Sequence, residues 1–183
     1  MKGIATGPRT RLERAFGGRR AVKPERRFVM SKRYYIAYGS NLNVWQMRYR
    51  CPDAKIVGTA VLDGWRLLFK GSKSGAYLTI EKDENGCVPV AVWSVSETDE
   101  QRLDRYEGFP SFYYKKELPV TISGIRTGRI SKRNAFVYIM HEERPLGIPS
   151  SAYIKTCAEG YRDFGFDTEM LFEAVINSRE ENI

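Results

Sequence analysis

The stretch YYIAYGSNLNVWQM, residues 34–47, changes character abruptly at Gly39. Residues 34–38 are aromatic and β-branched, which predicts a buried strand. Val44–Arg50 contains no turn residue and predicts the opening of a helix. A strand and a helix are therefore expected to meet at a five-residue loop, GSNLN.

That loop has two interpretations. In the first it is an ordinary connection, in which Asn43 caps the helix and Gln46 completes a capping box. In the second it is a ligand-binding loop, because Gly39 allows a ligand to approach the backbone closely and the N–H groups before the helix attract an anion. The remainder of the chain has to decide between the two.

Outward from the loop, apolar stretches predict further strands at 65–70, 76–81, 87–95, 112–122 and 134–140. The turn GSKSG separates the first two of these, and DENG precedes the third. Helical spacing predicts two late helices, at 150–165 and 167–178. We expect an α+β fold with a small mixed or antiparallel β-barrel-like sheet and flanking helices. Three tryptophans, Trp45, Trp65 and Trp93, are expected in its core.

The charge is concentrated at the beginning of the chain. Residues 1–30 hold nine Lys or Arg and two Glu, whereas residues 31–183 hold 21 basic and 20 acidic residues. Because residues 1–30 are rich in Gly, Pro and Arg, we expect a disordered extension before a domain at 31–183. This extension could bind nucleic acid, act as a targeting peptide, or be upstream sequence before a start at Met30. We favour the last, so nucleic acid is an expected partner only through the basic tail.

The three cysteines, Cys51, Cys87 and Cys157, are odd in number and lack CxxC spacing. This pattern favours buried thiols in a reducing compartment over disulfides or a zinc site. No apolar run approaches the roughly 20 residues that span a bilayer. We therefore expect a cytoplasmic protein with no membrane partner and no bound metal.

A helix interrupts the strands at SETDEQRLDRYEGFP, residues 96–110. Ser96 or Thr98 can cap it, and Gly108 and Pro110 end it. Glu107 is then its last residue, where the negative end of the helix dipole disfavours a carboxylate. A solvated Glu107 is one interpretation. The other is an acid of raised pKa among aromatic side chains, which can accept a proton and return it.

Three motifs together resemble the gamma-glutamylcyclotransferases and their plant avirulence-induced-protein-like relatives. YGSNL, at Tyr38, Gly39, Ser40, Asn41 and Leu42, is similar to the family's substrate loop, and EGFP resembles the segment with its catalytic glutamate. The helix beginning PSSAYIKTCAEGYRDFG resembles the family's late helix, in which Tyr153 would face the ligand. Tyr114 lies where the family tends to place a further tyrosine. The resemblance covers residues 33–165.

The resemblance implies that the α-amine of a small γ-glutamyl substrate attacks its own γ-carbonyl, which closes 5-oxoproline and expels an amine. Such an intramolecular attack needs no protein nucleophile and no cofactor, only a folded substrate and a proton carrier. Glu107 would carry the proton, and the loop residues Tyr38, Gly39, Ser40, Asn41 and Leu42 would bind the substrate. SNL after Tyr-Gly favours a dipeptide-type or bacterial-like branch. The leaving amine and the oligomeric state are not specified.

Other chemistries fit the sequence less well. The single histidine, His141, lacks an evident acid partner, and YGSNL lacks the lysine of a phosphate-binding loop. Five tyrosines are expected in the core or at the barrel rim: Tyr34, Tyr35, Tyr106, Tyr113 and Tyr161. Three acids of the interrupting helix are expected on its exposed face: Glu97, Glu100 and Asp104. The alternative function is that of a non-catalytic protein that binds a small molecule in the same pocket or nucleic acid through its tail.

Overall fold

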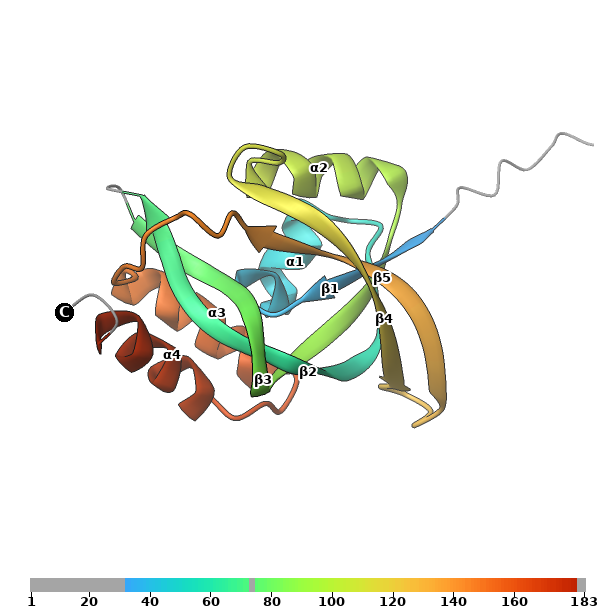
Figure 1. Ribbon diagram of the computed structural model, residues 1–183. Coiled ribbons are helices and arrows are strands. Elements are labelled where there is room, and N and C mark those ends of the chain that lie inside the picture. Colours follow the sequence, from blue (N-terminus) through green and yellow to red (C-terminus); the bar gives the residue numbers. More distant parts are fainter. Residues whose placement is uncertain (1–31, 73–74, 181–183) are drawn as a thin grey trace, which may run out of the picture.

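Five strands close into a barrel in the computed structural model, and helices surround it (Figure 1). The structure describes residues 32–72 and 75–180, so the predicted extension at 1–30 lies outside the described residues. The elements in chain order are β1 (Arg33–Ala37), the 3-10 turn η2 (Ser40–Leu42), α1 (Val44–Arg50), β2 (Lys55–Ser72), β3 (Gly75–Val95), α2 (Glu97–Glu107), β4 (Tyr113–Gly124), β5 (Ile130–Met140), α3 (Ser151–Asp163) and α4 (Glu169–Glu180).

The strand order around the barrel is β1-β3-β2-β4-β5. β1 closes it, because it pairs antiparallel with β3 and parallel with β5. Tyr35 is thus opposite Trp93 on one side and opposite Phe136 on the other. The expected α+β class with a small mixed barrel is confirmed. Strand β1, which lies between β3 and β5, leads directly into the GSNLN loop.

The long hairpin of β2 and β3 differs from the prediction of three shorter strands at 65–70, 76–81 and 87–95. β2 already begins at Lys55, and β3 runs through DENG without a break. Pairing passes from Asp63–Cys87 to Trp65–Lys82, so residues 83–86 bulge out of the strand. Turn-forming residues within a ladder can produce a bulge rather than a strand end, because the flanking pairs hold the register.

The core fills the barrel with apolar side chains and includes Trp65 and Trp93, as expected. Trp45 is not in the core: it is 75% exposed and stacks on Tyr49. The seven-residue α1 buries Met47, and Trp45 lies on its outer face. The prediction of buried thiols holds for Cys51 and Cys157 and is wrong for Cys87, which is exposed on β3.

Helices cover the barrel in two places. In Figure 1, α2 lies across the top of the view, whereas α3 and α4 lie side by side at the lower left. α4 is tied to β2 because the Ser178 hydroxyl accepts a hydrogen bond from the Phe69 N–H at 2.8 Å.

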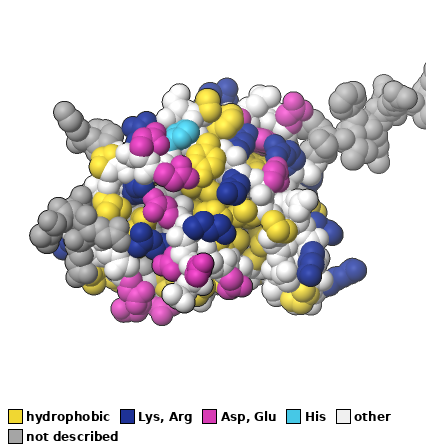
Figure 2. Space-filling model, in the orientation of Figure 1, with side chains coloured by type: hydrophobic (Ala, Val, Ile, Leu, Met, Phe, Trp, Pro, Cys, Tyr) yellow, Lys and Arg dark blue, Asp and Glu magenta, His cyan; other side chains and the backbone are white. Residues whose placement is uncertain are grey.

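Among the described residues, no helix combines the length and apolar character that crossing a bilayer requires. On the face drawn in Figure 2, basic and acidic side chains are interspersed.

Helix α3 holds the GSNLN loop in place. The side chains of Glu159 and Asp163 accept hydrogen bonds from the Asn43 amide at 3.1 Å and the Val44 N–H at 2.9 Å. Gly160 lets the two segments touch, since a Cβ on it would lie 2.5 Å from the Asn43 nitrogen and 2.7 Å from the Leu42 Cβ. The position of the loop therefore depends on a tertiary contact more than 100 residues away in the sequence.

We predict that Gly160→Ala destabilises the protein by about 1–3 kcal/mol, the cost of overpacking a filled site. In an open helix the same change would stabilise by about 1 kcal/mol, because alanine has the higher helix propensity. Denaturant unfolding measures the difference. Lys155→Ala on the exposed face of α3 is the control and should change stability by less than about 0.5 kcal/mol. A stabilised Gly160→Ala protein would contradict this packing.

Candidate active site

The GSNLN loop divides into a structural part and a part that faces a cavity. Leu42 is fully buried, and its N–H donates to the Gly39 carbonyl at 2.9 Å. Asn43 caps α1, because its side chain accepts from the Gln46 N–H at 3.0 Å. The Gln46 side chain does not complete a capping box and instead accepts a hydrogen bond from Arg50. The connecting interpretation therefore holds for the Asn43 cap, whereas ligand binding by Gly39, Ser40 and Asn41 stays a prediction.

The cap of α2 and its end follow the sequence signals. Ser96 accepts a hydrogen bond from the Asp99 N–H at 3.1 Å, and Gly108 ends the helix in the left-handed region with φ of 64°. The Phe109 N–H then donates to the Asp104 carbonyl at 2.9 Å, which closes the last turn. This turn directs Glu107, the last helical residue, toward the loop after β1.

Glu107 lies half-buried against that loop, at the wall of a cavity. Its Oε1 accepts a hydrogen bond from the Asn41 Nδ2 at 2.8 Å. Burial raises the pKa of Glu107 to about 7, while the charge of Arg50 and the Asn41 hydrogen bond oppose that rise. This direction agrees with the interpretation of Glu107 as an acid of raised pKa rather than a solvated helix-end carboxylate. A carboxyl group with this pKa can both accept and release a proton near neutral pH.

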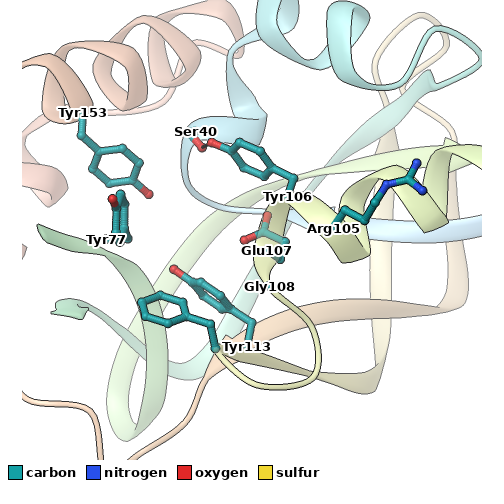
Figure 3. Close-up of a pocket in the computed structure, with 9 residues that line it drawn as sticks. Ser40, Tyr77, Arg105, Tyr106, Glu107, Gly108, Tyr113 and Tyr153 are labelled. Atoms are coloured by element: carbon teal, nitrogen blue, oxygen red, sulfur yellow. Dashed lines mark hydrogen bonds between the residues drawn. The ribbon is translucent and has the colours of Figure 1, made fainter. Parts of the chain in front are cut away.

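A cavity of about 440 Å³ opens in front of Glu107 (Figure 3). Residues from the loop, β3, α2, β4 and α3 line it: Ser40, Tyr77, Arg105, Tyr106, Glu107, Gly108, Phe112, Tyr113 and Tyr153. A narrower recess of about 30 Å³ shares four of these residues and adds Tyr35, Tyr38, Gly39, Asn41, Leu78 and Tyr138. In Figure 3 the Arg105 guanidinium points away from the other labelled side chains. The walls are therefore mostly aromatic around one carboxylate.

Two tyrosines in the wall are hydrogen-bonded to the backbone of the same β3 residue, Leu78. The Tyr113 hydroxyl donates to the Leu78 carbonyl at 2.9 Å, and the Tyr153 hydroxyl accepts from the Leu78 N–H at 3.2 Å. Tyr113 thereby uses its proton and keeps acceptor capacity, whereas the Tyr153 proton can be donated to the neighbouring Cys157 sulfur or to a bound molecule. The two hydroxyls consequently have opposite hydrogen-bonding character toward a bound molecule.

Most residues selected from the sequence come together here, and two do not. Leu42 packs under α3, outside the cavity. Tyr114 points away, and its hydroxyl donates to Glu142 at 2.6 Å. Successive strand residues face opposite sides of a sheet, so on β4 the neighbour Tyr113 enters the cavity instead. Tyr114, which the resemblance selected, therefore does not line this cavity, whereas Tyr113 does.

The sequence also assigned some residues to the wrong environment. Tyr113 lies in the core as expected and also lines the cavity, whereas Tyr106 is 47% exposed and lines the cavity as well. Glu100 and Asp104 were expected on an exposed face, yet both form ion pairs with Lys115, at 2.6 and 2.7 Å. Leu103 and Tyr106 are three residues apart on α2, and this spacing indicates that they share one helix face. The spacing does not indicate which part of that face is buried and which part meets solvent, so it could not place Tyr106.

Within the described ranges, no group of three or more His, Cys, Asp or Glu side chains could hold a metal ion.

The backbone of the loop offers free donors. The N–H groups of Gly39, Ser40 and Asn41 donate to no described residue, because the hydrogen bonds of the 3-10 turn begin with the N–H of Leu42. The arrangement can thus offer N–H donors and hydroxyl groups around one proton-accepting carboxylate.

The structure is therefore that of an α+β protein in which a closed barrel and its helices form an aromatic cavity around one carboxylate. The family described as gamma-glutamyl cyclotransferase, AIG2-like, matches residues 35–155. The chain belongs to this family. It is 30% identical to the gamma-glutamylcyclotransferase of Bos taurus over 155 residues, which cover 81% of this chain and 79% of the relative.

Solved structures show the same fold. A gamma-glutamyl cyclotransferase superimposes with a TM-score of 0.64 at 25% identity, over 79% of this chain and 86% of that chain. An uncharacterised protein from Homo sapiens superimposes with a TM-score of 0.64 at 25% identity, over 78% of this chain and 86% of that chain. YkqA from Bacillus subtilis superimposes with a TM-score of 0.66 at 20% identity, over 79% of this chain and 54% of that chain. At this identity the likeness shows the fold alone.

We predict that Glu107 makes stability fall with rising pH. Its pKa is 4.5 unfolded and about 7 folded, so between these values the folded state binds more protons and loses stability as pH rises. The loss is at most roughly 3 kcal/mol, at 1.36 kcal/mol for each pKa unit. Glu107→Gln removes it, so the variant should gain stability relative to the parent between pH 5 and pH 8.

Denaturant unfolding of both proteins at several pH values measures this relative gain. Glu97→Gln, an exposed acid of the same helix, is the matched control and should follow the parent at every pH. Parallel curves for Glu107→Gln and the parent would show that the Glu107 carboxylate is solvated in the folded state.

Proposed function

We propose that this protein cyclises the γ-glutamyl group of a small γ-glutamyl amide or dipeptide to 5-oxoproline and releases the amine. The observation that carries the proposal is the Glu107 carboxylate, desolvated at the cavity wall with a pKa of about 7. Family membership and the gamma-glutamylcyclotransferase from Bos taurus support it. The unpaired cysteines support a reducing, cytoplasmic setting.

The chemistry needs a bond between the α-amine nitrogen and the γ-carbonyl carbon, followed by cleavage of the γ-amide C–N bond. Starting from an ammonium group, the attacking nitrogen loses two protons and the departing nitrogen gains two. No water, electron or net proton is consumed. Glu107 would accept protons from the first nitrogen and return them to the second, which one carboxyl group can do when its pKa lies near the working pH.

The cavity supplies partners for the rest of such a substrate. The N–H groups of Ser40 and Asn41 would hold the α-carboxylate or the oxyanion that forms on the γ-carbonyl. Tyr153 has a proton to donate to an oxygen, and Tyr113 has a lone pair for the α-ammonium group. Binding the γ-glutamyl group in a folded conformation would bring its reacting atoms to about 3–3.5 Å.

We expect the full-length protein to release 5-oxoproline from at least one member of a panel of γ-glutamyl dipeptides and γ-glutamylamines. The rate should rise with pH through about 7 as Glu107 loses its proton. Glu107→Gln should lower turnover by at least about 10²-fold, because the amide cannot accept the proton.

Chromatographic detection of 5-oxoproline measures this release, and Glu97→Gln is again the matched control. A folded protein that leaves every panel member intact would refute the proposed reaction. Full turnover by Glu107→Gln would refute the role of Glu107 alone.

A separate prediction concerns Gly39. A Cβ there would lie 3.4 Å from the Tyr153 hydroxyl and 3.5 Å from the Leu78 Cβ, which is ordinary contact. Gly39→Ala should therefore be tolerated, whereas the branched side chain of Gly39→Val must displace the Tyr153 hydroxyl. We expect Gly39→Val to raise KM or lower kcat by roughly 10-fold or more, the effect of misplacing a positioning group. Kinetics and melting temperatures of both variants test this, and losses that follow melting temperature alone would contradict it.

A further inference from the structure

Arg50, the last residue of α1, is held at the edge of the site by several contacts. Its Nη1 donates to the Asn41 Oδ1 at 2.7 Å, and its Nη2 donates to the Tyr106 hydroxyl at 2.8 Å and to the Gln46 side chain. The guanidinium carbon also lies 3.7 Å from the centroid of the Tyr106 ring. Stacking and hydrogen bonding together fix the plane of the guanidinium group.

The first consequence concerns the amide of Asn41. A guanidinium group has donors and no acceptor, so the amide oxygen must face Arg50. The amide nitrogen then faces the other way and donates to the Glu107 Oε1 at 2.8 Å and to the Tyr35 hydroxyl at 2.9 Å. A reversed amide would place its oxygen against the Glu107 carboxylate and its nitrogen against the guanidinium group. Both contacts would be repulsive.

The second consequence concerns the hydroxyl of Ser40. The Ser40 Oγ and the Tyr106 hydroxyl lie 3.1 Å apart, and either can be the donor. Because the Tyr106 oxygen already accepts from Arg50, the direction in which Tyr106 donates to Ser40 is favoured. The Ser40 oxygen is then an acceptor within the protein, and its own proton remains for a molecule in the cavity that Ser40 lines. Two hydrogen-bond chains thus start at Arg50 and end at the cavity.

We infer that Arg50 is a positioning residue that sets the direction of both chains, so that Glu107 receives an N–H donor and Ser40 presents an O–H donor to an oxygen of the ligand. The role of the ligand rests on the proposed function, whereas the direction of the chains does not. Arg50 itself does not line the cavity, and it acts through Asn41 and Tyr106.

The charge of Arg50 acts on Glu107 in the same sense as the Asn41 bond. It lowers the pKa of Glu107 against the rise caused by burial. Among the described residues, the other titratable groups that face Glu107 come from β1, α2, β4, β5 and α3, and all are tyrosines with raised pKa values: Tyr35, Tyr38, Tyr106, Tyr113, Tyr138 and Tyr153. These tyrosines stay neutral at pH 5–9, so the charge of Arg50 is the one that a substitution can remove.

The test is to titrate Glu107 in the full-length protein by carbon-13 NMR of labelled glutamate carboxyl groups, with the signal assigned by its absence in Glu107→Gln. In Arg50→Met the midpoint should move to higher pH, and kcat/KM at pH 7 should fall by roughly 10²-fold. Arg50→Lys keeps the positive charge but loses the planar guanidinium group that donates two hydrogen bonds in fixed directions. Its Glu107 titration midpoint should therefore be closer to the parental value than its kcat/KM is. Arg48→Met, an exposed neighbour on α1, should match the parent in both readouts.

Tyr106→Phe is the second variant, and it keeps the test decisive if Arg50→Met does not fold. It interrupts the chain to Ser40 and leaves the chain to Glu107, so KM should rise while the Glu107 midpoint stays at its parental value. An unchanged midpoint in a folded Arg50→Met protein, or a moved midpoint in Tyr106→Phe, would overturn the inference. If the parent turns over no γ-glutamyl compound, the proposed function fails, but the titration still decides the role of Arg50.

Discussion

The hydrogen bond between the Asn41 amide and the Glu107 carboxylate is the contact on which the site depends. It joins the loop after β1 to the last turn of α2, alongside the contact between the Ser40 and Tyr106 hydroxyls and the Arg50 bridge from Asn41 to Tyr106. A carboxylate removed from water must be compensated locally or become protonated. Here one amide donor and the nearby guanidinium group of Arg50 compensate it in part, which leaves its pKa near neutrality rather than near 4.5.

This constraint explains why so much of the fold converges on one loop. The loop can present Asn41 only if Leu42 is buried and Asn43 starts a helix, and α3 fixes both through Gly160, Glu159 and neighbouring contacts. The barrel supplies the rest, because β1 lies between β3 and β5 and so ends at a defined point. The desolvated acid opposes stability above neutral pH, and the large apolar core offsets that cost.

Local signals in the sequence predicted local structure well. The start of α1 at Val44, its cap at Asn43, Ser96 as one of two candidate caps of α2 and the end of α2 at Gly108 were expected, because each depends on residues within one or two turns. The wrong predictions share a different cause. DENG bulges rather than ending a strand, and Trp45 is exposed, because pairing partners and packing partners distant in the sequence decide those outcomes.

The candidate site divides in the same way. The sequence by itself determined the candidates, since Glu107, the residues from Gly39 to Asn41 and Tyr153 stand in recognisable motifs, and the structure gathers them around one cavity and its recess. The tertiary structure decided which β4 tyrosine enters the cavity, since strand register turns Tyr113 inward. It also decided that Arg50 lies beside Asn41 and that Glu107 is desolvated. Burial and electrostatic coupling depend on groups brought together from distant parts of the chain, so no local pattern of residues encodes them.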